Sequence, residues 1–246
     1  MDIATISVPR LAIAFVPVAV VILLMWRWGQ GYARSLTAVA RMLLQLTLVG
    51  YVLVYIFRTD SGLVISGVLA VMLLAASWIA LNTASTPKAP MVLPALLSVG
   101  LGGGSTLVLI TQGVLQLDPW FRPNVMIPLA GMIFSAGMTN ISLALERLQA
   151  ELANGCGFRK ARDTAFRASM IPPINSFLAV GLISLPGMMT GQILSGVSPL
   201  IAVRYQIMVM CMIFGAAGLS TVCFMTLLHR TGRFREIRPE PQQSST

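Results

Sequence analysis

Seven long stretches of this chain contain no charged residue, and they limit its fold more than any other feature. They are 16 to 27 residues long and together make up more than half of the 246 residues. They cover residues 11–26, 42–57, 62–81, 91–117, 125–145, 174–194 and 205–228. A helix of about 20 apolar residues crosses a bilayer. Because only helices and closed barrels satisfy their backbone in lipid, and no stretch alternates as a barrel strand does, we predict membrane helices.

The composition agrees with this interpretation. Charged residues make up 10% of the chain, apolar residues 56%, and the mean hydropathy is +0.82, whereas soluble domains carry about 25% charged residues. We therefore predict an all-α membrane protein, a polytopic bundle of seven transmembrane helices. This domain would cover residues 1–228, followed by a flexible cytoplasmic tail over residues 229–246.

The net charge of +9 is interpreted as a record of orientation rather than as a nucleic-acid-binding surface. With the N-terminus outside and the C-terminus in the cytoplasm, 13 of the 17 Lys and Arg residues fall on the cytoplasmic side. The exceptions are Arg10, Arg58, Arg122 and Arg204. This asymmetry follows the positive-inside rule. The longest connection, residues 146–173, then faces the cytoplasm, where a soluble partner would bind.

The reactive side chains form no recognisable catalytic or metal site. Cys156, Cys211 and Cys223 lack CxxC spacing, and the single histidine, His229, follows the last stretch. No zinc or haem motif results from this spacing. The apolar stretches also contain no carboxylate. We predict no enzymatic activity and no cofactor bound by this chain.

Amide side chains inside the apolar stretches indicate either helix contacts or a transport pathway. Gln45 and Asn140 lie within such stretches, and Asn175 opens another. A polar side chain in a spanning helix usually faces another helix or a water-filled path. Both interpretations stay open for these residues.

Residues 186–192, Pro-Gly-Met-Met-Thr-Gly-Gln, predict a kinked or broken helix. Non-helical backbone at membrane depth is tolerated where it is buried or faces water, so such breaks often mark substrate sites. The alternative is a turn near the outer membrane surface. Met188, Met189 and Gln192 thus join Gln45, Asn140 and Asn175 as candidate pathway residues, with thioethers that either bind a soft metal or pack.

Three consecutive glycines occur within residues 100–105, where Gly100 and Gly104 also form a GxxxG pair. The pair predicts close helix packing, and the alternative is a hinge.

The longest connection predicts a helical hairpin in the cytoplasm. The helix that covers residues 125–145 runs into Glu146 and Arg147 without a stop signal, and residues 154–157 then break it. Helical spacing resumes over residues 158–170 and ends at the Pro172-Pro173 pair. This amphipathic hairpin either lies on the lipid surface or binds a soluble subunit.

Three sets of residues resemble one known family. They are Arg41-x3-Gln45-Leu46-x3-Gly50-Tyr51, Ile127-Pro128-Leu129-Ala130-Gly131-Met132 with Asn140-Ile141-Ser142, and above all Ser184-Leu185-Pro186-Gly187-Met188-Met189-Thr190-Gly191-Gln192 with Tyr205-Gln206-Ile207. They are similar to the FetB-type family of ABC transporter permeases. That family includes bacterial subunits implicated in iron export and plant relatives tied to aluminium tolerance. The resemblance spans about residues 36–228.

The resemblance implies a permease that pairs with a cytoplasmic ABC ATPase and with a second copy of itself. A P-loop needs Gly-Lys before Ser or Thr, and Lys88 follows Pro87 while Lys160 follows Arg159. ATP and magnesium are therefore expected on the partner. Glu151 and the glycines after it resemble the coupling loop of importer permeases. Glu151, Gly157 and Arg162 are accordingly the candidate residues for ATPase coupling.

The resemblance further implies a permease subunit in the inner membrane of a bacterium, exporting iron or another metal ion. An organic or sugar-nucleotide substrate is the alternative cargo. A stand-alone seven-helix carrier or channel and a seven-helix receptor are the rival classes. A carrier would usually have paired charges inside its helices, which this sequence lacks, and the outer loops are too short for much of a sensing surface.

Overall fold

The computed structural model describes residues 7–58, 61–84 and 88–235, apart from the side chains of Val8 and Arg235. The chain divides into two compact units, Met1–Thr59 and Asp60–Thr246. Both are helical, and the described residues contain no strand beyond one isolated bridge between Val180 and Ser184.

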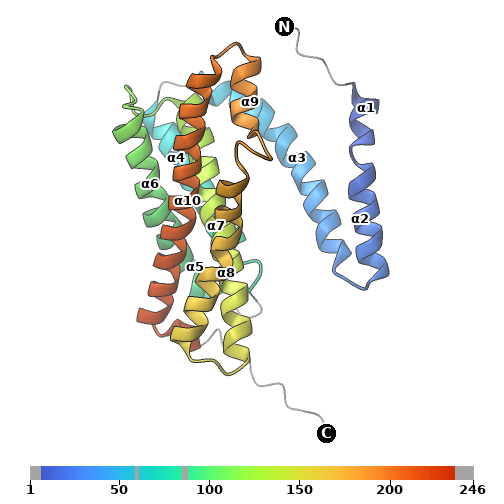
Figure 1. Ribbon diagram of the computed structural model, residues 1–246, viewed down its shortest axis with the longest axis vertical. Helices are drawn as coiled ribbons and strands as arrows, with labels where there is room; N and C mark the ends of the chain where they lie inside the picture. Colours follow the sequence, from blue (N-terminus) through green and yellow to red (C-terminus); the bar gives the residue numbers. More distant parts are fainter. Residues whose placement is uncertain (1–6, 59–60, 85–87, 236–246) are drawn as a thin grey trace. The chain divides into compact units, whose positions relative to one another are not determined.

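The first unit is a helical hairpin (Figure 1). α1 (Val8–Ile13) and α2 (Val16–Arg27) form one apolar segment, and α3 (Tyr32–Ile56) packs against α2. Gly29, with φ +67°, makes the turn between them, a conformation that glycine adopts without steric cost. Neither α2 nor α3 contains a buried residue. Their apolar side chains therefore need lipid or other protein around them.

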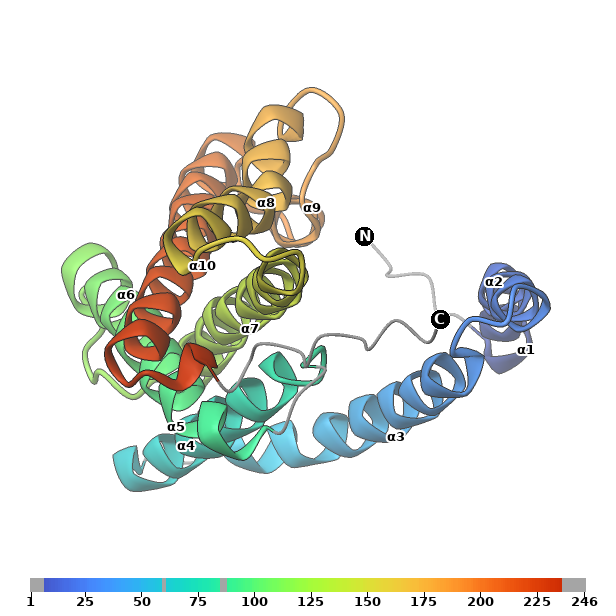
Figure 2. The ribbon, with the colours of Figure 1, turned by 90° about the horizontal axis from the view of Figure 1, so that it is seen from below.

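The second unit is built around α7 (Pro123–Ala153) and α10 (Pro199–Arg230). α4 (Gly62–Ala80), α5 (Ala89–Ser98) and α8 (Phe158–Ala179) pack on this pair (Figures 1 and 2). The core between them consists of large apolar side chains such as Ile133, Leu145 and Leu148 of α7 and Phe224 of α10, all fully buried. The predicted continuation of this helix through Glu146 and Arg147 is confirmed, because α7 runs to Ala153.

The glycine-rich segment remains helical and packs closely, as one of the two interpretations predicts. α5 leads through η1 (Val99–Gly103) and α6 (Gly104–Val108) to η2 (Leu109–Val114), where η1 and η2 are π-helical. The close contact lies at Gly102, where a Cβ atom would stand 2.5 Å from the backbone nitrogen of Ser220. The prediction that Gly100 and Gly104 form the contact is wrong, since a Cβ on Gly104 would meet nothing within 4 Å.

The predicted end of the hairpin at Pro172-Pro173 is also wrong. α8 passes through both prolines and ends at Ala179, so Asn175 and Ser176 lie inside this helix rather than opening a new one. The buried residues Ala161, Ala165, Ser169 and Met170 hold one face of α8 on its neighbours up to the prolines. Tertiary packing of this kind keeps proline-containing membrane helices intact.

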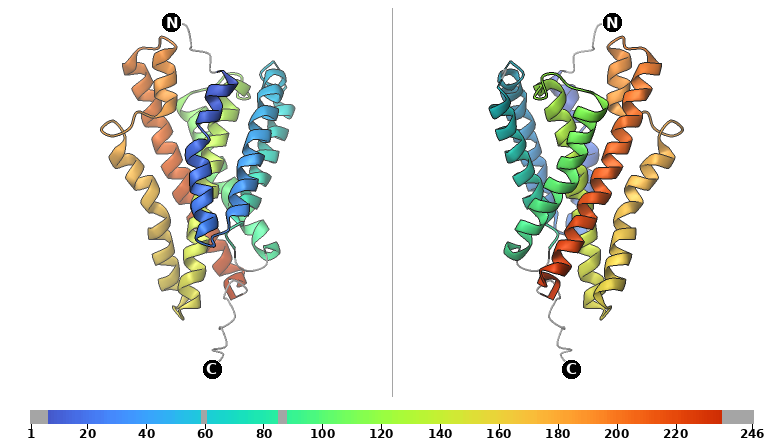
Figure 3. Two further views of the ribbon diagram at one scale, coloured as in Figure 1. Left: turned by 90° about the vertical axis from the view of Figure 1, so that its right-hand side faces the viewer. Right: turned by 90° about the vertical axis from the view of Figure 1, so that its left-hand side faces the viewer.

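The predicted break is present, but it lies earlier than residues 186–192. The chain leaves the helix at Val180, and Gly181 has φ +82°. Its amide donates to the Ser184 carbonyl. Pro186 then caps α9 (Gly187–Leu194), so the Pro-Gly-Met-Met-Thr-Gly-Gln run is mostly helical. Figure 3 shows the loop between α8 and α9 projecting away from α10 before α9 returns to it.

Six described segments are long and apolar enough to cross a membrane. They are Pro9–Arg27, Tyr32–Ile56, Gly62–Ala80, Ala89–Val114, Pro123–Ala153 and Pro199–Arg230. The seventh predicted segment is divided between α8 and α9. A seventh crossing and the orientation of the termini stay predictions.

The chain after α10 continues into the short helix η3 (Arg233–Arg235). The guanidinium of Arg233 donates a hydrogen bond to the carbonyl oxygen of Pro90. Residues 236–246 of the predicted flexible tail lie outside the described residues.

Candidate functional site

Three neighbouring pockets form a row along α8, and we call them the pocket row. The Gln206 pocket has a volume of about 440 Å³, the Ser176 pocket about 590 Å³ and the Asn140 pocket about 360 Å³. The Gln206 and Ser176 pockets share Val180, Pro186 and Met210. The Ser176 and Asn140 pockets share Pro172 and Ser176. The row therefore extends from the middle of α7 to the α9 end of α10.

The break after α8 creates the Gln206 pocket. Residues 180–186 leave the face of α10, and α9 returns to pack on α10. The pocket between them is lined by Phe177, Val180, Gly181, Leu185, Pro186, Met189, Val203, Gln206, Ile207, Met210 and Cys211. None of these side chains is charged.

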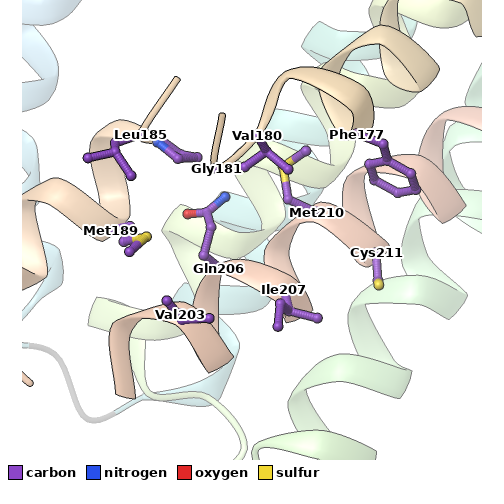
Figure 4. A pocket seen from close by; sticks show the side chains of 11 residues that line it. Phe177, Val180, Gly181, Leu185, Met189, Val203, Gln206, Ile207, Met210 and Cys211 are labelled. Carbon is purple, nitrogen blue, oxygen red and sulfur yellow. The ribbon is translucent and has the colours of Figure 1, made fainter. Parts of the chain in front are cut away.

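Gln206 is the one amide side chain of this lining. It is 6% exposed, and its Oε1 has no hydrogen-bond partner among the described residues. Figure 4 shows it in the middle of the lining residues, with Met189 on one side and Met210 on the other. A buried acceptor without a partner costs free energy, so a molecule in this pocket would gain by donating a hydrogen bond to it.

Asn140 joins three helices at the other end of the row. It lies on α7 and is 3% exposed. Its amide nitrogen is 3.3 Å from Ser169 Oγ of α8 and 3.3 Å from Thr221 Oγ1 of α10. The Met170 sulfur and the Ala217 carbonyl oxygen lie at 3.4 and 3.5 Å. Asn140 therefore holds α7, α8 and α10 together while also lining its pocket.

The structure brings three of the six candidate pathway residues into the pocket row. Asn140 and Asn175 line the Asn140 and Ser176 pockets, and Met189 lines the Gln206 pocket. Met188 is 38% exposed and lines none of the three.

The other two candidates lie elsewhere. Gln192 has a buried Oε1 with no partner among the described residues, yet it does not line the row. Gln45 belongs to the first unit and is exposed on α3.

The candidate coupling residues lie at the turn between α7 and α8. The Glu151 carboxylate pairs with Arg147 at 2.5 Å and accepts a hydrogen bond from the Cys156 thiol at 3.4 Å. Its side chain is only 14% exposed. Glu151 thus braces the hairpin internally instead of pointing outward. Gly157 caps the start of α8, and Arg162 pairs with its neighbour Asp163.

A basic surface begins directly after this turn. Arg159, Lys160 and Arg167 are exposed on α8, and with Asp163 and Thr164 they line a shallow hollow of about 470 Å³. These outward-facing side chains are better placed than Glu151 to contact a soluble protein. None of these three residues is assigned a role in partner binding from the sequence.

Comparison with known proteins now identifies the family. Residues 8–232 match the model of the Uncharacterised protein family (UPF0014). The chain is 34% identical over 236 residues to the probable iron export permease protein FetB of Escherichia coli, covering 88% of this chain and 89% of FetB. The chain belongs to the UPF0014 family. Six apolar segments among the described residues and relatives described as membrane proteins show that it is an integral membrane protein.

Relatives of this UPF0014 chain occur in other lineages as well. It is 36% identical over 201 residues to the protein ALUMINUM SENSITIVE 3 of Arabidopsis thaliana, covering 75% of this chain and 72% of that protein. It is 34% identical over 227 residues to a UPF0014 membrane protein of Synechocystis, covering 86% and 88%. No solved structure matches the chain. The resemblance to the FetB-type family is thus confirmed.

Gln206 of this UPF0014 chain was missed as a pathway candidate. The signal was available, because Gln206 is an amide inside an uncharged stretch, as Gln45 is. Ser176 and Met210, shared between neighbouring pockets, gave no such signal. Ser176 and Met210 line a common pocket only because α8 passes through its prolines.

The described residues contain no group of three or more His, Cys, Asp or Glu side chains that could hold a metal ion. The polar or polarisable side chains that line the pocket row are amides, thioethers, a thiol and hydroxyls such as those of Ser176 and Thr139.

Proposed function

We propose that this chain is the membrane permease subunit of an ABC transporter, driven by ATP that a separate cytoplasmic ATPase hydrolyses. The observation that carries the proposal is the continuity of α8. This one helix begins at the hairpin turn beside the basic surface and ends at the break that lines the Gln206 pocket. A displacement of the hairpin by a partner would therefore reach the pocket row through a single rigid element.

The coupling would depend on how α8 is held along its length. Asn140 binds Ser169 of α8 and Thr221 of α10, so a shift of α8 changes its contacts with both neighbours. ATP binding and release in the partner would favour two arrangements of these helices in turn, each opening the row to one side of the membrane. The ATP and magnesium would bind to the partner alone.

The relative named as a probable iron export permease makes iron the first cargo to test. Another metal ion, or an organic or sugar-nucleotide molecule, is the alternative cargo. As in other half-transporters, a second copy of this chain would complete the pathway, in the inner membrane of a bacterium. Symmetric pairing of identical subunits is the commonest arrangement of oligomers.

The test is purification of the tagged chain from its native membranes in mild detergent, with mass spectrometry of the proteins that accompany it. We expect a stoichiometric ABC ATPase. The double variant Arg159→Glu with Lys160→Glu should lose most of it, because these exposed cations form the proposed contact surface. The control variant Arg204→Glu, at an exposed position near the N-terminal end of α10, should retain the ATPase.

Retention of the ATPase by the Arg159→Glu, Lys160→Glu variant would contradict the proposed contact surface. Absence of any ATPase from the wild-type preparation, where a known ABC complex survives the same detergent, would contradict the permease assignment. A self-sufficient carrier would then be favoured.

A further inference from the structure

The lining of the Gln206 pocket indicates which chemical class of ligand the pocket can bind. Its side chains are aliphatic, aromatic or sulfur-containing, with the amide of Gln206 as the one strong hydrogen-bonding group. A volume of about 440 Å³ lies within the usual range for small-molecule sites, about 300 to 1,000 Å³. Such sites are typically apolar with a few polar groups that fix the ligand's orientation.

A bare hard cation fits this lining poorly. Hard divalent cations take about six oxygen ligands, several of them usually carboxylates or waters, and the pocket side chains offer one amide oxygen. Taking an ion out of water without a compensating charge costs many kcal/mol. Met189, Met210 and Cys211 are soft sulfur ligands, which suit soft metals such as Cu(I) rather than iron in an oxygen environment.

Gln206 points to a ligand that donates a hydrogen bond. Its Oε1 is buried and has no partner among the described residues, while the surrounding side chains offer only apolar contacts and weakly polar sulfur. A molecule with an apolar body and a single hydroxyl or N–H group would match both features.

We infer that the Gln206 pocket binds an uncharged, mostly apolar organic molecule that donates one hydrogen bond to Gln206. Iron would enter this pocket only inside an uncharged complex with an organic ligand. That the bound molecule is the transported one rests on the proposed permease function. The binding itself does not, so the two can fail separately.

The three cysteines of the chain provide a direct assay. Cys211 lines the pocket, whereas Cys223 lies on the same helix outside it and Cys156 lies at the hairpin turn. The full chain is placed in phosphatidylcholine nanodiscs and alkylated with N-ethylmaleimide, and each cysteine is quantified by peptide mass spectrometry. The probes are 4-phenylphenol, which has one hydroxyl donor, biphenyl, which has none, and iron(II) sulfate.

We expect 4-phenylphenol to slow the alkylation of Cys211 while Cys223 and Cys156 react at unchanged rates. Biphenyl should need a concentration roughly 2- to 10-fold higher for the same protection, the usual worth of one hydrogen bond. In the Gln206→Leu variant the two probes should protect equally. This variant should fold, because removing an unpaired buried polar group is neutral or stabilising.

The matched control is Gln112→Leu, the same change at an exposed glutamine outside the pocket. It should retain the preference for 4-phenylphenol. Equal protection of Cys211 and Cys223, a preference that survives in Gln206→Leu, or protection of Cys211 by iron(II) sulfate would each overturn the inference. The assay uses no ATPase, so these outcomes leave the partner test in native membranes unaffected.

Discussion

The two halves of α10 differ in how closely they are packed. Its C-terminal half contains Ser220, whose backbone nitrogen would lie 2.5 Å from a Cβ on Gly102 and whose Oγ would lie 2.8 Å from a Cβ on Gly137. Its N-terminal half faces the Gln206 pocket, and exposed apolar residues such as Leu200 and Ile207 lie on it. The C-terminal half of α10 is thus closely packed, and we call it the fixed end. The N-terminal half, which we call the open end, is packed less closely, so a conformational change should cost less free energy there.

This comparison also explains where the candidate site lies. Close backbone contact over small residues stabilises membrane helix pairs without a hydrophobic driving force. The α7–α10 contact uses it, so these helices can serve as a frame. The break between α8 and α9 has no such contact, since a Cβ on Gly181, Gly187 or Gly191 would meet nothing within 4 Å.

The largest expected effect is that of Gly102→Ala at the fixed end. The added methyl group would overlap the backbone of Ser220, and overpacking of this kind costs about 3 kcal/mol. We expect a clear fall in the midpoint of thermal unfolding, followed by the loss of monodisperse protein in size-exclusion chromatography. Gly104→Ala, two residues away in open space, should change the midpoint little. Equal midpoints would contradict the close contact.

A smaller effect is expected from Asn140→Leu. The variant removes the amide that lies between Ser169 and Thr221, while both hydroxyls keep a second bond, to the Phe166 and Ala217 carbonyls. Interhelical hydrogen bonds in membranes are worth about 0.6 to 1.7 kcal/mol, so the unfolding midpoint should fall by less than in Gly102→Ala. Asn175→Leu, at an exposed position on α8, serves as the control. An unchanged midpoint would show that Asn140 does not hold the helices together.

Gly181→Ala should affect the break more than the stability of the whole chain. Its φ of +82° costs a residue with a Cβ about 1 to 2 kcal/mol. Because the strain is confined to this segment, we expect faster hydrogen exchange over residues 180–186 with a small change in global unfolding. Gly187→Ala, with no positive φ, is the matched variant. Identical exchange in both would argue that the break does not depend on the left-handed conformation.

The smallest effect compares two methionines of α10. Met212 is 1% exposed in the core, and Met210 lines the pocket row. Met212→Leu should cost about 1 kcal/mol through imperfect repacking, whereas Met210→Leu, beside open space, should stay within about 0.5 kcal/mol. Chemical unfolding of the two variants in one detergent measures the difference. Equal losses would mean that the pocket side of α10 is packed as closely as its core side.

The sequence predicts most of the helical fold, because uncharged length is a direct consequence of spanning lipid. It also predicts the continuation of α7 through Glu146 and Arg147 and the turn at residues 154–157. It fails at Pro172-Pro173, where local proline chemistry suggests an end and tertiary packing on α7 keeps the helix. The predicted position of the break is wrong for a related reason, since Pro186 begins a helix instead of ending one.

The candidate site is less predictable, since it depends on those two positions. Once α8 continues to Ala179 and α9 starts at Gly187, Gln206 and Met210 face the same pocket as Met189. The sequence alone places these residues in separate stretches. The pairing of Glu151 with Arg147 and Cys156 is likewise not evident from the sequence, because it depends on the turn geometry. The role of Glu151 in ATPase coupling stays a prediction.

The proposal that α8 transmits the motion of an ATPase to the pocket row is tested most directly by alkylation of Cys211. The complex is purified from native membranes, and the rate of N-ethylmaleimide reaction is measured with and without a non-hydrolysable ATP analogue. We predict that the analogue changes the rate at Cys211 severalfold while Cys223, in the closely packed half of α10, keeps its rate. An intact complex in which nucleotide leaves the rate at Cys211 unchanged would contradict coupling through α8.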